Sequence, residues 1–410
     1  MIFKRFSLAV LFAGILLLGT LPAFAWDETG HKITAYIAWQ RMTPEAREKV
    51  MKILLSAPED SQIGSYYFPY GSRSAEARKR EYFMLMATWA DIIRDRALNT
   101  RYTKYHKGNW HYADTFWQWK DGKAVFIETA EDSGLASQKL SEFAQLIRGS
   151  APDAEKAVAI VWLEHIIGDL HQPLHTSAKV NDSNPKGDQG GNLFFLTPKG
   201  TPREKQENLH SYWDGIIGRY SPNAKDQCDA DYIDPIAQEI IKLYPYEKLR
   251  DKINPDKFDV WTKESLDIAT SFVYKDLKFF ESPSDNYKKK AFEISQERLA
   301  LAGYRIGDLF NEVFGTASAI APVPAAATGS IPCKIIRKVL YPVMQTSSVK
   351  QTLEISLLDL CPTHIAARPM YSFMIDGKPV MKEYDVLKTF KTEAEAKKYA
   401  VDNSITDVVF

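Results

Sequence analysis

One segment, residues 154–171, restricts the fold of this chain more than any other part of the sequence. Its large apolar residues fall on more than one face of a helix, which indicates a helix at the centre of a domain: Val158, Val161, Leu163, Ile166, Ile167 and Leu170. The same segment carries His165 and Asp169, which are four residues apart and therefore on one face. Because buried charges need partners, we expect this pair to hold a cation inside the domain.

The spacing of histidine and aspartate recurs further along the chain. Pro173 interrupts the helix, so that His175 can approach from a different direction. His210 and Asp214 again stand at positions i and i+4. Two such pairs in a chain with only 8 histidines indicate a metal site made of imidazole and carboxylate groups, which are ligands that zinc accepts.

The N-terminal residues predict an exported protein. Residues 1–25 have a basic start, an apolar stretch and an Ala-x-Ala-like end before Trp26, the pattern of a cleaved secretory signal. An uncleaved membrane anchor is the alternative interpretation. With cleavage we expect a secreted or periplasmic protein that makes no stable membrane insertion. Since the formal net charge of the chain is zero, any affinity for an anionic polymer has to be local.

The cysteines limit the kind of metal site. Cys228, Cys333 and Cys361 are too few and too widely spaced for a cysteine-rich zinc site. In an oxidising compartment Cys333 and Cys361 are close enough in sequence to form a disulfide within one small domain, which would leave Cys228 without a cysteine partner. Whether that pair forms stays open. A metal in this chain would bind through histidine and carboxylate.

The 410 residues predict one large unit and one small unit. Residues 29–314 read as successive amphipathic helices, so the fold class is mainly α, with helices expected at 44–55, 76–95, 137–148, 154–171, 263–273 and 285–314. Residues 181–200 predict a long loop with one short strand at 193–196. The uncharged, alanine- and proline-rich residues 316–331 predict a linker. Residues 332–410 predict a small α+β domain of unknown role, with strands at 335–344, 351–358 and 369–374, a hairpin turn at Asp376-Gly377 and a helix at 393–401.

Three further candidate ligands lie upstream, each in a short motif. His31 follows the predicted cleavage point closely, Asp91 lies in Thr-Trp-Ala-Asp-Ile-Ile-Arg, and His111 lies in Asn-Trp-His-Tyr-Ala-Asp. With these motifs in this order, residues 26 to about 314 resemble the S1/P1 nuclease family of zinc-dependent, single-strand-preferring endonucleases and 3′-nucleotidases. The resemblance implies a multi-helical phospholipase C/P1 nuclease-like domain that holds three Zn²⁺ ions.

The resemblance also assigns ligands to each zinc ion. One zinc matches four side chains: Asp91, His111, His165 and Asp169. A second matches the α-amino nitrogen and carbonyl oxygen of the first residue after cleavage together with two side chains: Trp26, His31 and again Asp169. The third matches three side chains: His175, His210 and Asp214. The shared aspartate would therefore bridge two metals.

A mechanism and a substrate follow from the same resemblance. A zinc-bridging hydroxide, formed because the two bridged ions lower the pKa of water and oriented by Asp91, would attack phosphorus and give 5′-phosphorylated products. Arg94 and Asn192 match residues that contact the scissile phosphate. Tyr112 matches an aromatic residue that stacks on a base, and Asp114 matches a carboxylate that binds the base edge. Stacking requires an unpaired base, so the implied substrates are single-stranded DNA and RNA as well as 3′-nucleotides.

Two other functions are compatible with parts of this pattern. A zinc-dependent phospholipase C has a similar trinuclear site, but the short spacing from Trp26 to His31 and the use of Asp214 where those lipases have glutamate favour the nuclease. A zinc-binding protein without turnover would not need Arg94 or Asn192. His171 lies between the predicted ligands His165 and His175 but has no place in the ligand pattern of the family. On a helix it faces away from the His165 side.

Overall fold

The computed structural model describes residues 26–70, 73–224, 227–315 and, further on, 335–345, 349–358, 365–375, 378–383 and 388–390. Several predictions fall outside the described residues: the signal sequence, the linker, the turn at 376–377, the helix at 393–401, and a pairing of Cys333 with Cys361. Cys228 is exposed, and its thiol is free.

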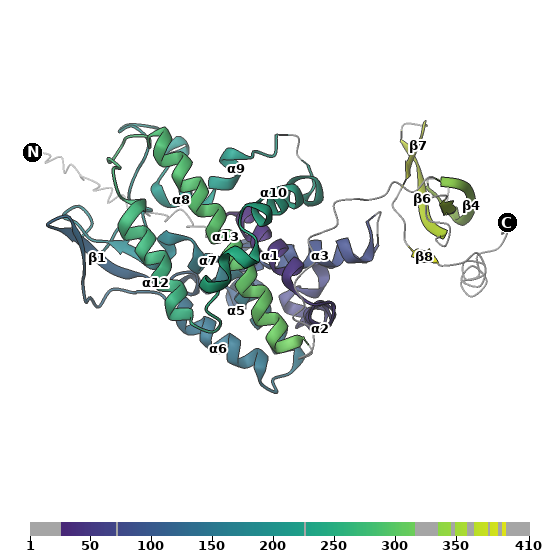
Figure 1. Ribbon diagram of the computed structural model, residues 1–410, viewed down its shortest axis with the longest axis horizontal. Helices are drawn as coiled ribbons and strands as arrows, with labels where there is room; N and C mark the ends of the chain where they lie inside the picture. The colour runs from purple at the N-terminus through teal and green to yellow at the C-terminus, as the bar shows by residue number, and fades with distance from the viewer. Residues whose placement is uncertain are drawn as a thin grey trace, which may run out of the picture.

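Helices dominate residues 26–315, as predicted for a mainly α fold (Figure 1). They are α1 Glu28–Arg41, α2 Pro44–Leu55, α3 Ala75–Met86, α4 Trp89–Ile92, α5 Thr100–Tyr105, α6 Ala136–Arg148, α7 Asp153–His171, α8 Leu209–Asp214, α9 Ile216–Tyr220, α10 Asp229–Leu243, α11 Tyr246–Leu249, α12 Phe258–Ile268 and α13 Asp285–Phe314. Four of the six predicted helices are confirmed almost to the residue. The other two have different bounds.

The helix predicted at 76–95 is broken in the structure. Its two parts, α3 and α4, are separated by Ala87 and Thr88. The Thr88 hydroxyl donates to the carbonyl of Leu85 at 2.7 Å, a local bond that competes with the helix ladder. The helix predicted at 263–273 begins five residues earlier, and its last part, Ala269–Val273, is π-helical.

A small sheet interrupts the region predicted to be helical. It contains β1 Thr115–Lys120, β2 Lys123–Phe126 and β3 Ser177–Lys179, in the order β2-β1-β3. The first two strands form an antiparallel hairpin whose turn residues, Asp121 and Gly122, have φ of 51° and 72°. Asp-Gly is a strong hairpin signal, and the prediction of helices throughout was wrong here. The third strand pairs in parallel with β1, directly after His175.

The strand predicted at 193–196 is also wrong. Only an isolated bridge joins Phe195 to Asn208 in this loop. The backbone amides of Leu193 and Phe194 instead donate to the carbonyls of Asp188 and Gly191, so turns use the groups that a strand would have paired.

Three helices, α1, α7 and α13, form the centre of the helical body (Figure 1). Every residue from Ala159 to His171 in α7 is buried, which confirms the predicted central helix. Gly303 on α13 allows a close approach to α1, since a Cβ there would lie 2.5 Å from the Cβ of Ile37. The ligand-bearing part of α7 is therefore fixed on all sides by packing.

A buried polar network holds the C-terminal end of α7 on the side away from the predicted ligands. His171 contacts Arg305 through its Nε2 atom at 2.7 Å, and its carbonyl accepts a bond from Arg298 at 3.2 Å. Glu264 on α12 pairs with both arginines, at 2.9 Å and 2.8 Å. This histidine thus belongs to the support of α7, in agreement with its exclusion from the ligand set.

The C-terminal strands, taken by themselves, form an antiparallel sheet. It consists of β4 Ile335–Gln345, β5 Val349–Leu358, β6 Ile365–Ile375, β7 Lys378–Glu383 and β8 Lys388–Phe390, in the order β4-β5-β6-β7 with β8 also paired to β6. Strands cover the three predicted segments and two more. Within the described parts of the chain, no helix has the length and apolar character needed to cross a bilayer.

Candidate metal centre

Eight predicted ligands come together from six separate parts of the fold. Helices α1, α4, α7 and α8 supply six of them: His31, Asp91, His165, Asp169, His210 and Asp214. The other two lie at short 3₁₀ turns: His111 directly follows Gly108–Trp110, and His175 lies within Pro173–Thr176. Their nitrogen and oxygen atoms form three groups, two of which share His165, and the donor atoms within each group lie within 4.8 Å of one another.

The first group, which consists of Asp91, His111 and His165 together with Asp169, has the spacing of a metal coordination shell. Donor atoms on one tetrahedral zinc ion, at the usual bond lengths, lie roughly 3.3 Å apart. The Nε2 atom of His165 lies 2.9 Å from Nδ1 of His111, 3.3 Å from Oδ2 of Asp169 and 3.7 Å from Oδ1 of Asp91. The Nδ1 atom of His111 lies 3.2 Å from the same Asp169 oxygen. Four donors thus surround one point.

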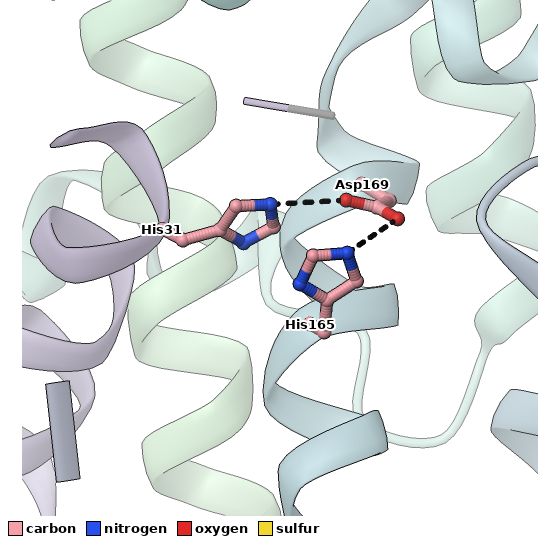
Figure 2. A group of neighbouring side chains, drawn as sticks. All are labelled: His31, His165 and Asp169. Carbon is pink, nitrogen blue, oxygen red and sulfur yellow. Dashed lines mark ion pairs between the residues drawn. The ribbon is translucent and has the colours of Figure 1, made fainter. Parts of the chain in front are cut away.

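The two oxygens of Asp169 point to different groups (Figure 2). Oδ1 lies 3.2 Å from Nε2 of His31 on α1, whereas Oδ2 lies beside His165 and His111. The imidazole rings of His31 and His165 are stacked with centroids 4.1 Å apart. A carboxylate in this position can bridge two cations, as the resemblance implied.

The third group is formed by His175, His210 and Asp214. Oδ2 of Asp214 lies 3.4 Å from Nε2 of His210, and its Oδ1 lies 4.0 Å from Nε2 of His175. Gln172 donates to Oδ1 of Asp214 at 2.6 Å and accepts from the amide of Leu174 at 2.6 Å. The glutamine therefore sets the orientation of the carboxylate.

Backbone carbonyls orient three of the imidazoles. The Nδ1 atoms of His165, His175 and His210 lie 2.8, 2.6 and 2.7 Å from the carbonyl oxygens of Ala87, His111 and Gly190, respectively. A proton on Nδ1 leaves Nε2 as the lone-pair donor, which is the tautomer that metal-binding histidines adopt. The break between α3 and α4 supplies the first of these carbonyls.

Burial of the site favours a bound cation. Burial lowers the pKa of His31 to about 4, so its imidazole is neutral and able to donate a lone pair. Burial also raises the pKa of Asp169 and Asp214 well above the usual range, because desolvation of each carboxylate outweighs the neighbours that lower its pKa. In the described part of the chain, Oδ1 of Asp91, Oδ1 of Asp169 and Nε2 of His175 form no hydrogen bond, although Arg94 and His31 lie near the two oxygens. These donor atoms fit metal ions, and zinc matches their chemistry.

The backbone of Trp26 lies close to these groups. Its side chain is fully buried and packs on Gly30, where a Cβ would lie 2.6 Å from the Cβ of Trp26. The next residue, Asp27, caps α1 by accepting from the Gly30 amide at 3.0 Å, and its own amide donates to the carbonyl of Asp214 at 3.1 Å. Residue 26 thus stands between α1 and α8, where the predicted N-terminal ligand would have to be.

Arg94 lies beside one of the predicted ligands. Its Nε atom lies 3.1 Å from Oδ1 of Asp91. Burial is the main cause of the low pKa of His111, and the positive charge of Arg94 is the next. The guanidinium is thus placed where an anionic substrate at the ligands would meet it.

Asn192 is placed by two glycines. Gly190 and Gly191 have φ of 60° and 83°, and a Cβ on Gly190 would lie 2.4 Å from the carbonyl of Leu174 and 3.2 Å from Nδ1 of His210. The chain therefore passes directly over the third group. The Asn192 amide donates to the carbonyl of Gln189 at 2.8 Å, which holds the side chain in the turn.

Tyr112 and Asp114 follow the ligand His111 on the way into β1. Tyr112 is half-buried, and its hydroxyl donates to Asp132 at 3.2 Å. Burial and then the charge of Asp132 raise the pKa of Tyr112 to about 12. Burial and then the charge of Asp188 raise the pKa of Asp114 well above its usual range. A carboxyl group in that state can donate a hydrogen bond as well as accept one.

Comparison with known proteins decides the family. The model of the S1/P1 nuclease family matches residues 26–315. The chain belongs to the S1/P1 nuclease family. Nuclease S1 of Aspergillus oryzae is 25% identical over 298 residues, which cover 69% of this chain and 90% of that nuclease. Endonuclease 1 of Arabidopsis thaliana is 24% identical over 354 residues, which cover 79% and 98%.

Among solved structures, the alpha toxin from Clostridium absonum is similar over 90% of this chain and 85% of the toxin. Its sequence identity is 13% and the TM-score is 0.31. An overlap at that score is too low to add to the argument for the fold.

Two residues that support this family site were missed by sequence reasoning. Gln172 orients Asp214, and its position inside the run of ligands from His165 to His175 was the available signal. Gly168 lies on the α7 face toward His31, where a Cβ would be 2.8 Å from Nδ1. Glycine inside a helix is unfavourable by about 1 kcal/mol relative to alanine, so its presence between two ligands was a second signal.

Proposed function

We propose that this protein is an exported nuclease and 3′-nucleotidase with three zinc ions, which hydrolyses single-stranded DNA and RNA to 5′-phosphorylated products. The observation that supports the proposal most is the set of three buried histidine and aspartate groups in a chain of the S1/P1 nuclease family. Residues 26–315 would form the catalytic domain, and residues 332–410 a separate module reached through the linker. Secretion or a periplasmic location follows from the signal pattern before Trp26.

The proposed ligand sets are those implied by the family. Asp91, His111, His165 and Asp169 would hold one ion, Trp26, His31 and Asp169 a second, and His175, His210 and Asp214 the third. Bound zinc ions would supply positive charge toward a phosphodiester and acidify water. The chain itself contributes neutral imidazoles, fixed in one tautomer by backbone carbonyls, and carboxylates that cannot be solvated by water in their buried position.

Other side chains would bind and orient the substrate. Arg94, next to Asp91, has a guanidinium that can bind two phosphate oxygens, and Asn192 directly follows two glycines that approach His210 of the third group closely. Tyr112 presents a half-buried ring on which an unpaired base can stack, and Asp114 offers a carboxyl group to the base edge. Base pairing would withdraw the base from this ring, which explains a preference for single strands.

The experiment uses the protein that begins at Trp26, with zinc measured alongside hydrolysis of single-stranded DNA, a 3′-nucleotide and phosphatidylcholine. We expect three zinc ions per chain, cleavage of the first two substrates and 5′-phosphate ends. The matched variant Asp169→Asn should lose two bridging contacts and most activity while remaining folded. Cleavage of phosphatidylcholine without cleavage of DNA would reject the nuclease in favour of a phospholipase C, and full zinc content without any hydrolysis would favour a zinc-binding protein.

A further inference from the structure

A strongly basic segment connects two of the candidate ligands. Between Asp91 and His111, residues 94–107 contain five cationic side chains, Arg94, Arg96, Arg101, Lys104 and Lys107, against a single carboxylate, Asp95. The chain as a whole has no net charge. This segment therefore carries a local excess of positive charge, and it begins at Arg94 beside the candidate ligand Asp91.

Two of these cations fasten the segment to the rest of the fold. Arg101 donates to the Tyr66 hydroxyl at 2.9 Å. Lys104 pairs with Asp60 at 2.5 Å, and the Tyr105 hydroxyl donates to the same carboxylate at 2.6 Å. Lys104 is thus neutralised by a carboxylate, and Arg101 is held by a neutral hydroxyl.

The remaining cations gather around His106. Its ring stacks on Tyr102 with centroids 4.9 Å apart, and the guanidinium of Arg96 lies over the Tyr102 ring, 5.8 Å from its centroid. Burial lowers the pKa of His106, and Arg94, Lys107 and Arg96 lower it further. Tyr102, His106 and Arg96 therefore form one group of side chains.

This group of side chains, Arg96, Tyr102, His106 and Lys107, is called the 96–107 cluster below. It is next to the candidate site along the chain, because Arg94 stands two residues before Arg96 and its Nε atom lies 3.1 Å from Oδ1 of Asp91. Neither Arg96 nor Lys107 forms an ion pair with any described residue, and no hydrogen-bond partner from the same residues reaches Nδ1 of His106. The cluster thus holds two cations without an ion-pair partner among the described residues and one unsatisfied polar atom.

We propose that the 96–107 cluster binds the phosphates of a single-stranded polynucleotide next to the scissile bond. The inference rests on the proposed function and adds a specificity: the cluster favours strands over mononucleotides. A 3′-nucleotide carries one phosphate, which the metal centre and Arg94 would bind. No second phosphate is then left for Arg96 and Lys107. A longer strand offers further phosphates, and basic side chains beside aromatic rings are the usual means of binding single strands.

The test compares two substrates in one double variant, Arg96→Gln with Lys107→Gln. Removal of two phosphate contacts should reduce kcat/KM for single-stranded DNA about tenfold at low salt and make the slope of log affinity against log salt shallower by about 1.4. Hydrolysis of a 3′-nucleotide should stay within about twofold of the wild-type rate, which also reports that the variant is folded. Neither residue contacts a ligand side chain in the described structure.

A matched control removes two cations elsewhere. Lys248 lies over the ring of Tyr244 at 4.8 Å, much as Arg96 lies over Tyr102, and Arg250 follows two residues later. These residues are near the Arg41 end of α1, about 15 Å along the helix from His31. The variant Lys248→Gln with Arg250→Gln should leave both activities and the salt slope unchanged.

The outcomes separate the inference from the function beneath it. Wild-type protein that cleaves neither substrate contradicts the proposed function itself. Active wild type with an unchanged salt slope in the 96–107 double variant overturns the inference alone. Equal loss on DNA and on the 3′-nucleotide overturns it as well, because the two residues would then support the metal centre rather than the strand.

Discussion

Replacing Gly168 by alanine should remove one zinc ion while the fold is kept. A Cβ at this position would lie 2.8 Å from Nδ1 and 3.0 Å from Cε1 of His31, whereas ordinary contacts begin at 3.4 Å. The imidazole would therefore have to move by about 0.6 Å. Metal–ligand distances tolerate changes of only about 0.2 Å, so Nε2 of His31 could no longer share an ion with Oδ1 of Asp169.

Helix propensity makes this outcome informative. Alanine favours a helix interior over glycine by about 1 kcal/mol, so Gly168→Ala should not unfold α7. The control is Gly218→Ala on α9, where the nearest atoms to a new Cβ, on Asp27 and Tyr232, are 3.7 Å and 3.9 Å away. That variant should keep its zinc and activity.

Zinc per chain, hydrolysis of single-stranded DNA and urea unfolding together test the reasoning. We expect two zinc ions instead of three for Gly168→Ala, a large loss of rate and an unfolding transition that remains cooperative. Three zinc ions with a normal rate would show that His31 tolerates the displacement, and the steric argument would then be refuted.

Three further variants probe other parts of the site. One extra residue before Trp26 should abolish one zinc ion and most activity, and normal zinc content in this variant would reject the N-terminal ligand. Gln172→Leu leaves Oδ1 of Asp214 without its donor and should weaken zinc binding about 10- to 100-fold, as measured by competition with a chelator; unchanged affinity would contradict the orienting role. Glu264→Gln leaves two buried arginines without a charged partner and should lower the free energy of unfolding by about 3 kcal/mol. Burial raises the pKa of Glu264, but the hydrogen bonds and charges of Arg305 and Arg298 together outweigh burial and hold this pKa below 4.5. The loss of stability caused by Glu264→Gln should therefore be present at neutral pH and shrink as the pH falls below that value. A difference that grows in acid would have the wrong sign.

The ligands could be predicted because their spacing is a local property. His165 and Asp169 share a face of any helix that contains them, and the apolar surroundings of this helix require it to be buried. The same reasoning excluded His171, which the structure places on Arg305. Asp91 and His111, by contrast, depended on the resemblance, since nothing in their own sequence context places them beside α7.

The missed features depend on tertiary structure or on a signal that was overlooked. Asp121-Gly122 marks a hairpin, but aromatic residues in the flanking strands also suit an amphipathic helix. The role of Gln172 depends on where α8 packs, and α8 is 37 residues further along. The strand wrongly predicted at 193–196 also shows the limit of local sequence. An apolar run predicts burial, but the positive φ of Gly190 and Gly191 leads the chain into this run through turns.

The wide separation of the ligands along the chain has a consequence for folding. From His31 to Asp214 they span most of the helical body, so each bound ion would tie together segments that are dozens of residues apart. Cross-links of this kind lower the entropy of the unfolded chain, as disulfides do. Among the described residues Cys228 is a free thiol and forms no disulfide. Metal ions would therefore be the cross-links of this domain. Assembly of the centre must then wait until α8 has folded, and chelation should speed unfolding rather than merely silence the enzyme.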